Sequence, residues 1–277
     1  MEITEAFVRE RLPEIKAEYN KYDRGRLLLI AGSYGMAGAS ILACRSALRS
    51  GIGYLNAAVP REIYEILAGS VPEAVFTVYE KPEDLRKALG KADAVLLGPG
   101  LGTLRDPVSA FVFSNGTKPL LIDADGLNAL AASPRAFFGK DVVLTPHEGE
   151  MARLLGISSP EVHMDRREAL LRAAERFQAF VLLKGPETLV TDGHVVLENH
   201  TGNPCLAAAG SGDVLSGIIG TFLAQGVKAF DAAAMGAWIH GRAGDLAAER
   251  LGVRSARPSD VIEMIPDVLR RLEGSEE

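Results

Sequence analysis

The sequence predicts an α/β fold in three layers, with helices on both faces of a mostly parallel β-sheet. Short apolar runs recur along the chain, and helix-like segments separate them. Several of these runs are apolar throughout rather than alternating, as expected for parallel strands covered on both faces. We find no linker, repeat or low-complexity segment, so we expect one domain over residues 1–277.

The order of the elements supports this prediction. Seven runs read as buried or half-buried strands, at 26–32, 54–60, 74–78, 94–100, 119–125, 142–147 and 179–185. Helices are expected between them, at 40–50, 83–89, 126–132, 148–155 and 166–178. A hairpin then follows at 188–199 with Asp192-Gly193 as its turn, and three further helices are expected at 212–225, 231–251 and 258–272.

Composition narrows the class of protein. With 47% hydrophobic and 24% charged residues the chain is an ordinary globular sequence, and its net charge of −6 argues against binding nucleic acid or an anionic membrane. The N-terminus has no apolar signal region, and no apolar run is long enough to span a membrane. Cys44 and Cys205 lie far apart, which favours two reduced, buried thiols and a cytoplasmic location.

In open α/β sheets, ligands bind beyond the carboxyl ends of the strands, so the segments after each strand are the candidate sites. Residues 31–39, AGSYGMAGA, and 98–102, GPGLG, are small-residue loops. Their glycines allow a ligand to approach the backbone closely, but simple turns explain both loops equally well.

Three strand ends carry charged or titratable side chains. Asp123 and Asp125 end one strand, although an aspartate such as Asp125 at a helix start is commonly an N-cap. His147 leaves the next strand, followed by Glu148 and Glu150 in a first helical turn, where the helix dipole favours acids. His147 either faces a cleft or is an ordinary surface residue.

The pattern that most strongly indicates a binding site comes late in the chain. Lys184 and Gly185 end a strand, where the lysine either binds an anion or is solvated. Residues 209–212, Ala-Gly-Ser-Gly, form a tight turn into a helix whose free N–H groups and dipole suit an anion. Asp213 beside that anion hole is positioned as a general base, although a first-turn aspartate can also simply complement the dipole.

A G-x-G-D turn that opens a late helix resembles the signature of the ribokinase-like superfamily. The ordered motifs AGSYGMAGAS, GPGLG, IDADGLNAL, LTPHEGEMARLLG, LKGPETLVTDG and NHTGNPCLAAAGSGDVLSGIIGTFLAQG resemble those of the NAD(P)H-hydrate dehydratases, from about Leu27 to Gly252. The chain resembles a stand-alone dehydratase without an epimerase domain in front.

The resemblance implies a repair reaction on the S-epimer of hydrated NADH or NADPH. The hydroxyl on the nicotinamide ring would be phosphorylated by ADP or ATP with Mg²⁺, and phosphate would then depart. Asp213 would act as the general base, and the backbone of Gly210, Ser211 and Gly212 would hold the developing charge.

Further site residues follow from the resemblance by position. The hydrated cofactor should contact Ala39, Gly102, His147 and Asp213. The nucleotide should lie along Lys184, Gly185, Pro186, Glu187 and Thr188 and contact Gly212. Glu150 stands where related kinases carry an acidic residue near Mg²⁺ and phosphate, but the sequence leaves the metal ligands open.

The sequence also departs from the family. Cys205, Leu206 and Ala208 replace a glycine, a methionine and a threonine that the family commonly has there. The missing threonine hydroxyl would weaken one phosphate contact, while the G-x-G-D core is intact.

Two other functions stay open at this point: a kinase of the same fold, such as a hydroxyethylthiazole or hydroxymethylpyrimidine kinase, and a nucleotide-binding regulator with a dead site. The donor, ADP or ATP, and the preference for NADH or NADPH hydrate also stay open. By analogy with relatives we expect a homotetramer and a functional partnership with a separate NAD(P)H-hydrate epimerase.

Overall fold

The computed structural model describes residues 1–102 and 106–274. In these ranges one nine-stranded sheet has the order β3-β2-β1-β4-β5-β6-β7-β8-β9. The strands are β1 (Arg26–Ile30), β2 (Tyr54–Pro60), β3 (Val75–Tyr79), β4 (Ala94–Leu97), β5 (Leu120–Ile122), β6 (Val142–Leu144), β7 (Phe180–Leu183), β8 (Thr188–Thr191) and β9 (Val196–Asn199). Neighbours from β3 to β7 pair in parallel, and β7, β8 and β9 pair antiparallel.

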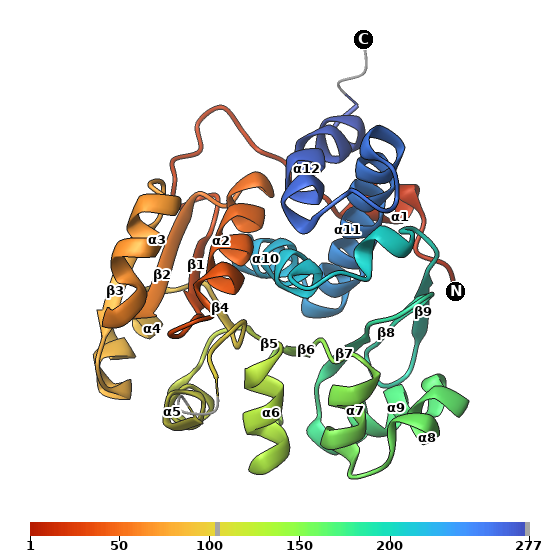
Figure 1. Cartoon of the computed structure of the whole chain (residues 1–277), viewed down its shortest axis with the longest axis horizontal. Coiled ribbons are helices and arrows are strands. Elements are labelled where there is room, and N and C mark those ends of the chain that lie inside the picture. The colour runs from red at the N-terminus through yellow and green to blue at the C-terminus, as the bar shows by residue number, and fades with distance from the viewer. Residues whose placement is uncertain (103–105, 275–277) are drawn as a thin grey trace.

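Helices cover both faces of the sheet, as Figure 1 shows. One layer contains α1 (Glu5–Arg11), α2 (Ala37–Arg49), α3 (Tyr64–Ser70), α10 (Ser211–Ala224), α11 (Ala229–Leu251) and α12 (Pro258–Leu272). The other contains α4 (Arg86–Lys91), α5 (Asp106–Asn115), α6 (Asp125–Ala132), α7 (Glu148–Leu155), α8 (Ser159–Met164) and α9 (Arg166–Phe177). Each layer buries its own apolar cluster against the sheet, which confirms the three-layer prediction.

The predicted strands all occur, but some details differ. The helix expected at 40–50 begins at Ala37. The hairpin turn, expected at Asp192-Gly193, is a four-residue loop over residues 192–195. Asp192 stabilises this loop by accepting hydrogen bonds from the N–H groups of His194 and Val195. The short helices α1, α3, α5 and α8 were not predicted, because their few turns carry too little periodic pattern to be recognised. Over the described ranges, no helix combines the length and the apolar character that crossing a bilayer requires.

Helix α10 lies at the centre of its layer. It packs against α2 and α11, and its buried residues run without a break from Val214 to Ala224. The apolar sequence after Asp213 is therefore the sequence of a helix enclosed on all sides. Its first turn reaches the carboxyl edge of the sheet, so a rigid core element supports the Asp213 backbone.

Gly217 sets the distance between α10 and α2. A methyl group on its Cα would overlap the Ser46 hydroxyl oxygen and the Ala43 carbonyl of α2. Backbone atoms cannot give way as a side chain can, so the two helices would have to separate.

We therefore expect Gly217→Ala to lower the free energy of unfolding by about 1–3 kcal/mol, the usual cost of overpacking a core. Denaturant unfolding would measure the change. Gly69→Ala in α3 is the matched control, because open space surrounds Gly69 and alanine is the better helix former. Equal stability of the Gly217→Ala variant and the wild type would contradict the close helix crossing.

Candidate active site

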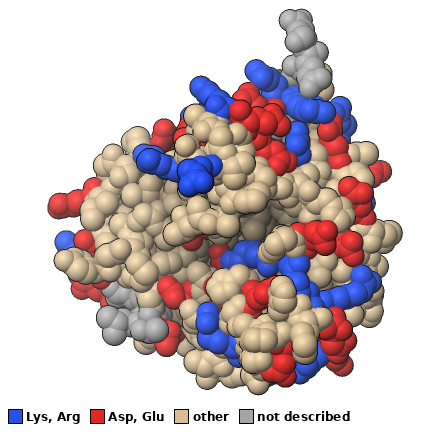
Figure 2. Space-filling model, turned by 45° about the vertical axis from the view of Figure 1, so that its right-hand side comes forward, with Lys and Arg blue, Asp and Glu red and all other residues tan. Residues whose placement is uncertain are grey.

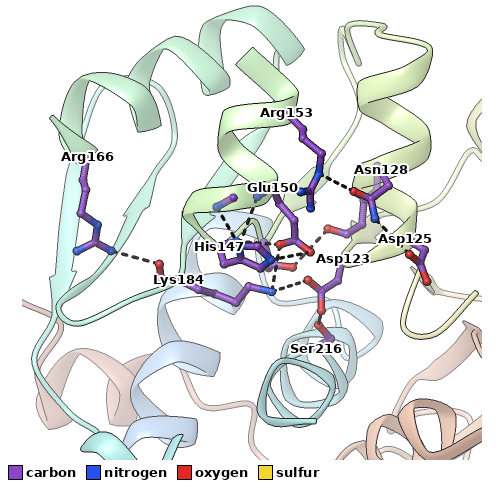
Figure 3. Close-up of polar contacts among 12 residues, drawn as sticks. Asp123, Asp125, Asn128, His147, Glu150, Arg153, Arg166, Lys184 and Ser216 are labelled. Atoms are coloured by element: carbon purple, nitrogen blue, oxygen red, sulfur yellow. Dashed lines mark hydrogen bonds and ion pairs between the residues drawn. The ribbon is translucent and has the colours of Figure 1, made fainter. Parts of the chain in front are cut away.

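The carboxyl ends of the central parallel strands bring the candidate residues together. The segments after β5, β6 and β7 carry Asp123, His147 and Lys184, and these strands are direct neighbours in the sheet. Helix α10 begins opposite them. In Figure 3 the side chains of Lys184, Asp123 and Ser216 meet between the sheet and α10. A space-filling view shows a hollow near the middle of one face of the molecule, with charged side chains along its rim (Figure 2).

The N-terminus of α10 has the form that binds anions. Gly210 is the N-cap with φ of 96°, a conformation that favours glycine, and no side chain caps the helix. The N–H of Ser211 donates to the Ala208 carbonyl at 3.1 Å. Among the described residues, the N–H groups of Gly212 and Asp213 have no backbone acceptor. Within the described ranges, the N–H of the N-cap Gly210 likewise has no backbone acceptor. These two helix N–H groups and that of Gly210, but not that of Ser211, are therefore the donors available to an anion.

A buried ion pair lies directly beneath this turn. Lys184 Nζ is 2.8 Å from Asp123 Oδ1 and 3.6 Å from Glu150 Oε2. The other Asp123 oxygen accepts a 2.6 Å hydrogen bond from the Ser216 hydroxyl of α10. A Cβ placed on Gly212 would lie 3.4 Å from Lys184 Nζ, which shows how closely the ammonium approaches the turn. Lys184 is thus an ion-paired residue of the site rather than a solvated surface lysine.

The surroundings of Lys184 and Asp213 raise the pKa of both groups. Burial alone would lower the pKa of Lys184, but the carboxylates of Asp123 and Glu150 outweigh it and raise this pKa, so the ammonium stays charged. Burial, reinforced by the negative charge of Asp123, raises the pKa of Asp213 to about 7, although Lys184 acts against the shift. A carboxylate with a pKa near neutrality suits general base catalysis.

His147 has a structural role as well as a place in the site. It is the N-cap of α7, and its Nδ1 accepts hydrogen bonds from the N–H groups of Gly149 (3.0 Å) and Glu150 (3.4 Å). Glu150 in turn accepts from the His147 N–H at 2.8 Å, which completes a capping box. Since Nδ1 is an acceptor, a neutral ring carries its proton on Nε2. The side chain is 55% exposed, and Nε2 lies 3.6 Å from Glu150 Oε1, beyond hydrogen-bond distance, so its N–H remains available to a ligand.

The two small-residue loops meet beside α6. Asp125 is the first residue of α6 rather than its N-cap, and its carboxylate accepts a 2.8 Å hydrogen bond from the Gly102 N–H. A Cβ on Gly100 would come within 2.9 Å of the Ala39 methyl group. The predicted substrate residues Ala39 and Gly102 therefore lie in one cluster, which Asp125 organises.

The predicted nucleotide residues form the turn between β7 and β8. Gly185 has φ of 147° and Glu187 has φ of 53°, so the turn is unusually shaped. Arg166 of α9 holds it, with its guanidinium donating to the carbonyls of Lys184, Pro186 and Glu187 and pairing with Glu148. Thr188 donates its hydroxyl to the Gly185 carbonyl at 3.1 Å. Of the residues in this turn, Lys184 lies against Gly212.

Three residues near the site were not predicted from the sequence: Arg166, Ser216 and His240. The ring Nε2 of His240 lies 3.2 Å from the Ser211 hydroxyl. Each of the three lies in a helix and contacts residues that are distant in the sequence, so no local pattern could reveal it. Asp123 was noticed as one of two carboxylates at a strand end, but its central place becomes visible only when β7 and α10 are set beside it.

The fold belongs to a known class. The structure matches a ribokinase-like superfamily protein from Enterococcus faecalis with a TM-score of 0.88 at 24% identity, covering 97% of this chain and 95% of that one. A hydroxyethylthiazole kinase from Pyrococcus horikoshii matches with a TM-score of only 0.59 at 20% identity, over 97% of this chain and 92% of that chain, which again shows the fold alone. The predicted ribokinase-like fold is confirmed.

The sequence then specifies the family. Residues 27–267 match the family model described as NAD(P)H-hydrate dehydratase. An ADP-dependent (S)-NAD(P)H-hydrate dehydratase from Neisseria meningitidis is 39% identical over 83% of this chain and 79% of its own length. The ADP/ATP-dependent NAD(P)H-hydrate dehydratase of Bacillus subtilis, co-crystallised with ATP/Mg²⁺, matches with a TM-score of 0.87 at 29% identity over 98% of both chains. The chain belongs to the NAD(P)H-hydrate dehydratase family, and these matches favour it over the kinases.

Some relatives are longer. A bifunctional NAD(P)H-hydrate repair enzyme from Moorella thermoacetica is 42% identical over 98% of this chain but only 54% of its own length. The chain thus spans about half the length of the bifunctional relatives it matches.

The raised pKa of Asp213 has a consequence for stability. The fold favours the protonated carboxyl, so the native state binds this proton more tightly than the unfolded chain, whose pKa is near 3.8. The contribution of this proton to the free energy of unfolding is complete below pH 3.8 and is lost as the pH rises toward 7. We therefore expect Asp213→Asn to gain stability relative to the wild type between pH 5 and pH 8. The gain is at most about 1.4 kcal/mol for each pH unit crossed.

Denaturant unfolding of both proteins at pH 5 and pH 8 measures this difference, and it needs no substrate. A stability difference that is the same at the two pH values would show that the Asp213 carboxyl has an ordinary affinity for protons.

Proposed function

We propose that this protein catalyses the nucleotide-driven dehydration of the S-epimer of hydrated NADH or NADPH, with ADP as the donor that the relatives favour. The observation that carries the proposal is Asp213, a half-buried carboxylate in the first turn of α10 beside two free N–H groups. A base next to an anion hole is what phosphoryl transfer to a hydroxyl requires.

The chemistry follows in two steps. Asp213 removes the proton of the ring hydroxyl while the hydroxyl oxygen attacks the terminal phosphorus of the nucleotide, and the bond from that phosphorus to the bridging oxygen breaks. Phosphate, a far better leaving group than hydroxide, then departs from the ring carbon. Loss of a proton from the neighbouring carbon restores the double bond of the reduced nicotinamide.

The protein's own groups support the first step. The N–H groups of Gly212 and Asp213 hold the transferring phosphoryl group as negative charge develops on it. Lys184, locked by Asp123 beneath the turn, provides a fixed positive charge close to Gly212. The turn of Gly185, Pro186, Glu187 and Thr188, shaped by Arg166, would carry the rest of the nucleotide, while Ala39, Gly102 and His147 would contact the hydrated cofactor.

Magnesium fits the donor set near Glu150. Over residues 1–102 and 106–274 no three His, Cys, Asp or Glu side chains gather to hold a metal by themselves. Mg²⁺ commonly uses one or two carboxylates together with substrate phosphates and water, and Glu150, 7% exposed beside Lys184, is the carboxylate that would hold it. When bound, Mg²⁺ would neutralise charge on the nucleotide phosphates.

The setting of the reaction is also a proposal. Relatives that carry two activities support a functional partnership with an NAD(P)H-hydrate epimerase. Free, buried Cys44 and Cys205 are in keeping with the cytoplasm. Every proposed site residue lies along one sheet, which supports a single catalytic domain over residues 1–277, and a homotetramer remains our expectation by analogy.

Asp213→Asn tests the function. We expect the substitution to lower kcat by about 10²–10⁴-fold, the usual contribution of a general base. The return of near-ultraviolet absorbance from hydrated NADH with Mg²⁺ measures turnover, with ADP and ATP supplied separately. Asp231→Asn is the matched control, because Asp231 is another first-turn aspartate and it pairs with Arg11 away from the site.

A folded wild-type protein that binds nucleotide but restores no absorbance would overturn the dehydratase proposal. Thiazole and pyrimidine alcohols would then be screened as kinase substrates. Turnover with only one of the two nucleotides would identify the donor.

His147→Asn separates capping from ligand binding. Asparagine is a good N-cap, so stability should change little, but its shorter side chain cannot present the Nε2–H donor. We expect KM for the hydrate to rise about 2–10-fold, the value of one hydrogen bond, with kcat nearly unchanged. His147→Ala should show the same KM effect and also lose about 1 kcal/mol of stability. Steady-state kinetics with denaturant unfolding measures both, and a large loss of kcat in His147→Asn would place His147 in the chemical step instead.

A further inference from the structure

The segment of residues 199–203, which precedes Asp213, is hydrogen-bonded along one face of α11. Asn199 and Thr201 donate to the carbonyls of Ala237 and Trp238 at 3.2 and 3.1 Å. About two turns further along α11, the Asn203 amide donates to the Gly244 carbonyl and the Asp245 carboxylate. The segment is thus fixed to successive turns of one rigid helix.

Close packing reinforces these hydrogen bonds. A Cβ on Gly241 would overlap the Thr201 hydroxyl oxygen, and a Cβ on Gly244 would come within 2.7 Å of Leu206. The glycines of α11 therefore allow the chain to lie directly against the helix backbone.

His240 lies between these two sets of contacts and reaches the G-x-G-D turn itself. Its Nε2 is 3.2 Å from the hydroxyl of Ser211, the first residue of α10. Both residues are buried, at 8% and 6% exposure, so water does not compete for this contact. The first turn of α10 has no capping side chain, and Gly210 and Gly212 flank Ser211. The Ser211–His240 contact therefore restrains a turn that its own sequence leaves free.

We propose that His240 is a positioning residue for the phosphoryl-transfer step: by holding Ser211, it aims the N–H groups of Gly212 and Asp213 and the Asp213 carboxylate. The inference rests on the proposed function for the identity of that step. His240 acts only through Ser211, and its ring is not required to contact substrate.

The charge state of the ring agrees with this role. Burial and, to a smaller extent, the positive charge of Lys184 lower the pKa of His240 to about 4, against a weaker opposing effect of the Ser211 backbone. The imidazole is neutral at physiological pH. It thus orients the turn by a hydrogen bond and adds no charge beside the anion hole.

Four variants test the proposal by steady-state kinetics. His240→Phe keeps a ring but loses the hydrogen bond, and Ser211→Ala removes it from the other side. Each should lower kcat by about 10- to 100-fold, since small misplacements at a reacting centre are costly, and KM for ADP should stay nearly constant. The double variant should be no worse than the poorer single one, because both remove one interaction. His240→Gln, which can place a polar atom near the position of Nε2, should recover most of kcat.

Thr221→Val is the matched control, because Thr221 is another buried hydroxyl of α10, bonded to the Ala47 and Gly217 carbonyls away from the site. It should alter stability but not kcat. A wild-type kcat in folded His240→Phe, a loss confined to KM for ADP, or additive losses in the double variant would each overturn the positioning role. Ser211→Ala, a minimal truncation, keeps the test decisive if His240→Phe fails to fold.

A second readout separates this inference from the proposed function. Hydrogen–deuterium exchange of the peptide covering residues 209–214 should be faster in His240→Phe than in the wild type, and unchanged in Thr221→Val. This measurement needs no hydrated cofactor. Absent turnover in the wild type would therefore overturn the function alone, whereas unchanged exchange in His240→Phe would overturn the positioning role.

Discussion

The site depends on one buried ion pair, between Asp123 at the end of β5 and Lys184 at the end of β7. Its ammonium also approaches Glu150, and its carboxylate also binds Ser216 of α10. Removing one partner from such a pair typically costs about 3–5 kcal/mol, because the other charge is left buried. The pair therefore ties the sheet to the helix that carries Asp213 and fixes the distance between them.

The same pair adjusts the pKa of Asp213. Burial is the main cause that raises this pKa, the negative charge of Asp123 raises it further, and Lys184 limits the effect. A core helix supplies two free N–H groups at the same place. The structure thus brings together a carboxyl group with a near-neutral pKa, an ion-paired ammonium and free N–H groups.

Supporting residues shape each part of the site from outside it. Arg166 holds the carbonyls of the turn after β7, Asp125 holds Gly102, and His147 caps α7 while presenting its second nitrogen. His240 completes the series at the start of α10. Arg166 and Asp125 fix backbone groups of other segments, His240 contacts a side chain of another helix, and His147 caps its own helix, so contacts both local and distant preorganise the site.

The sequence by itself determined the layered fold, the strand ends that carry chemistry, and the G-x-G-D turn with Asp213, because periodicity, glycine and capping signals are local. It could not predict the partner of Lys184, the role of Arg166 or the contact of His240. Those depend on which strands become neighbours and which helix faces meet. The near-neutral pKa of Asp213 was likewise decided by the tertiary structure, since burial and the nearby charges of Asp123 and Lys184 exist only once the chain has folded.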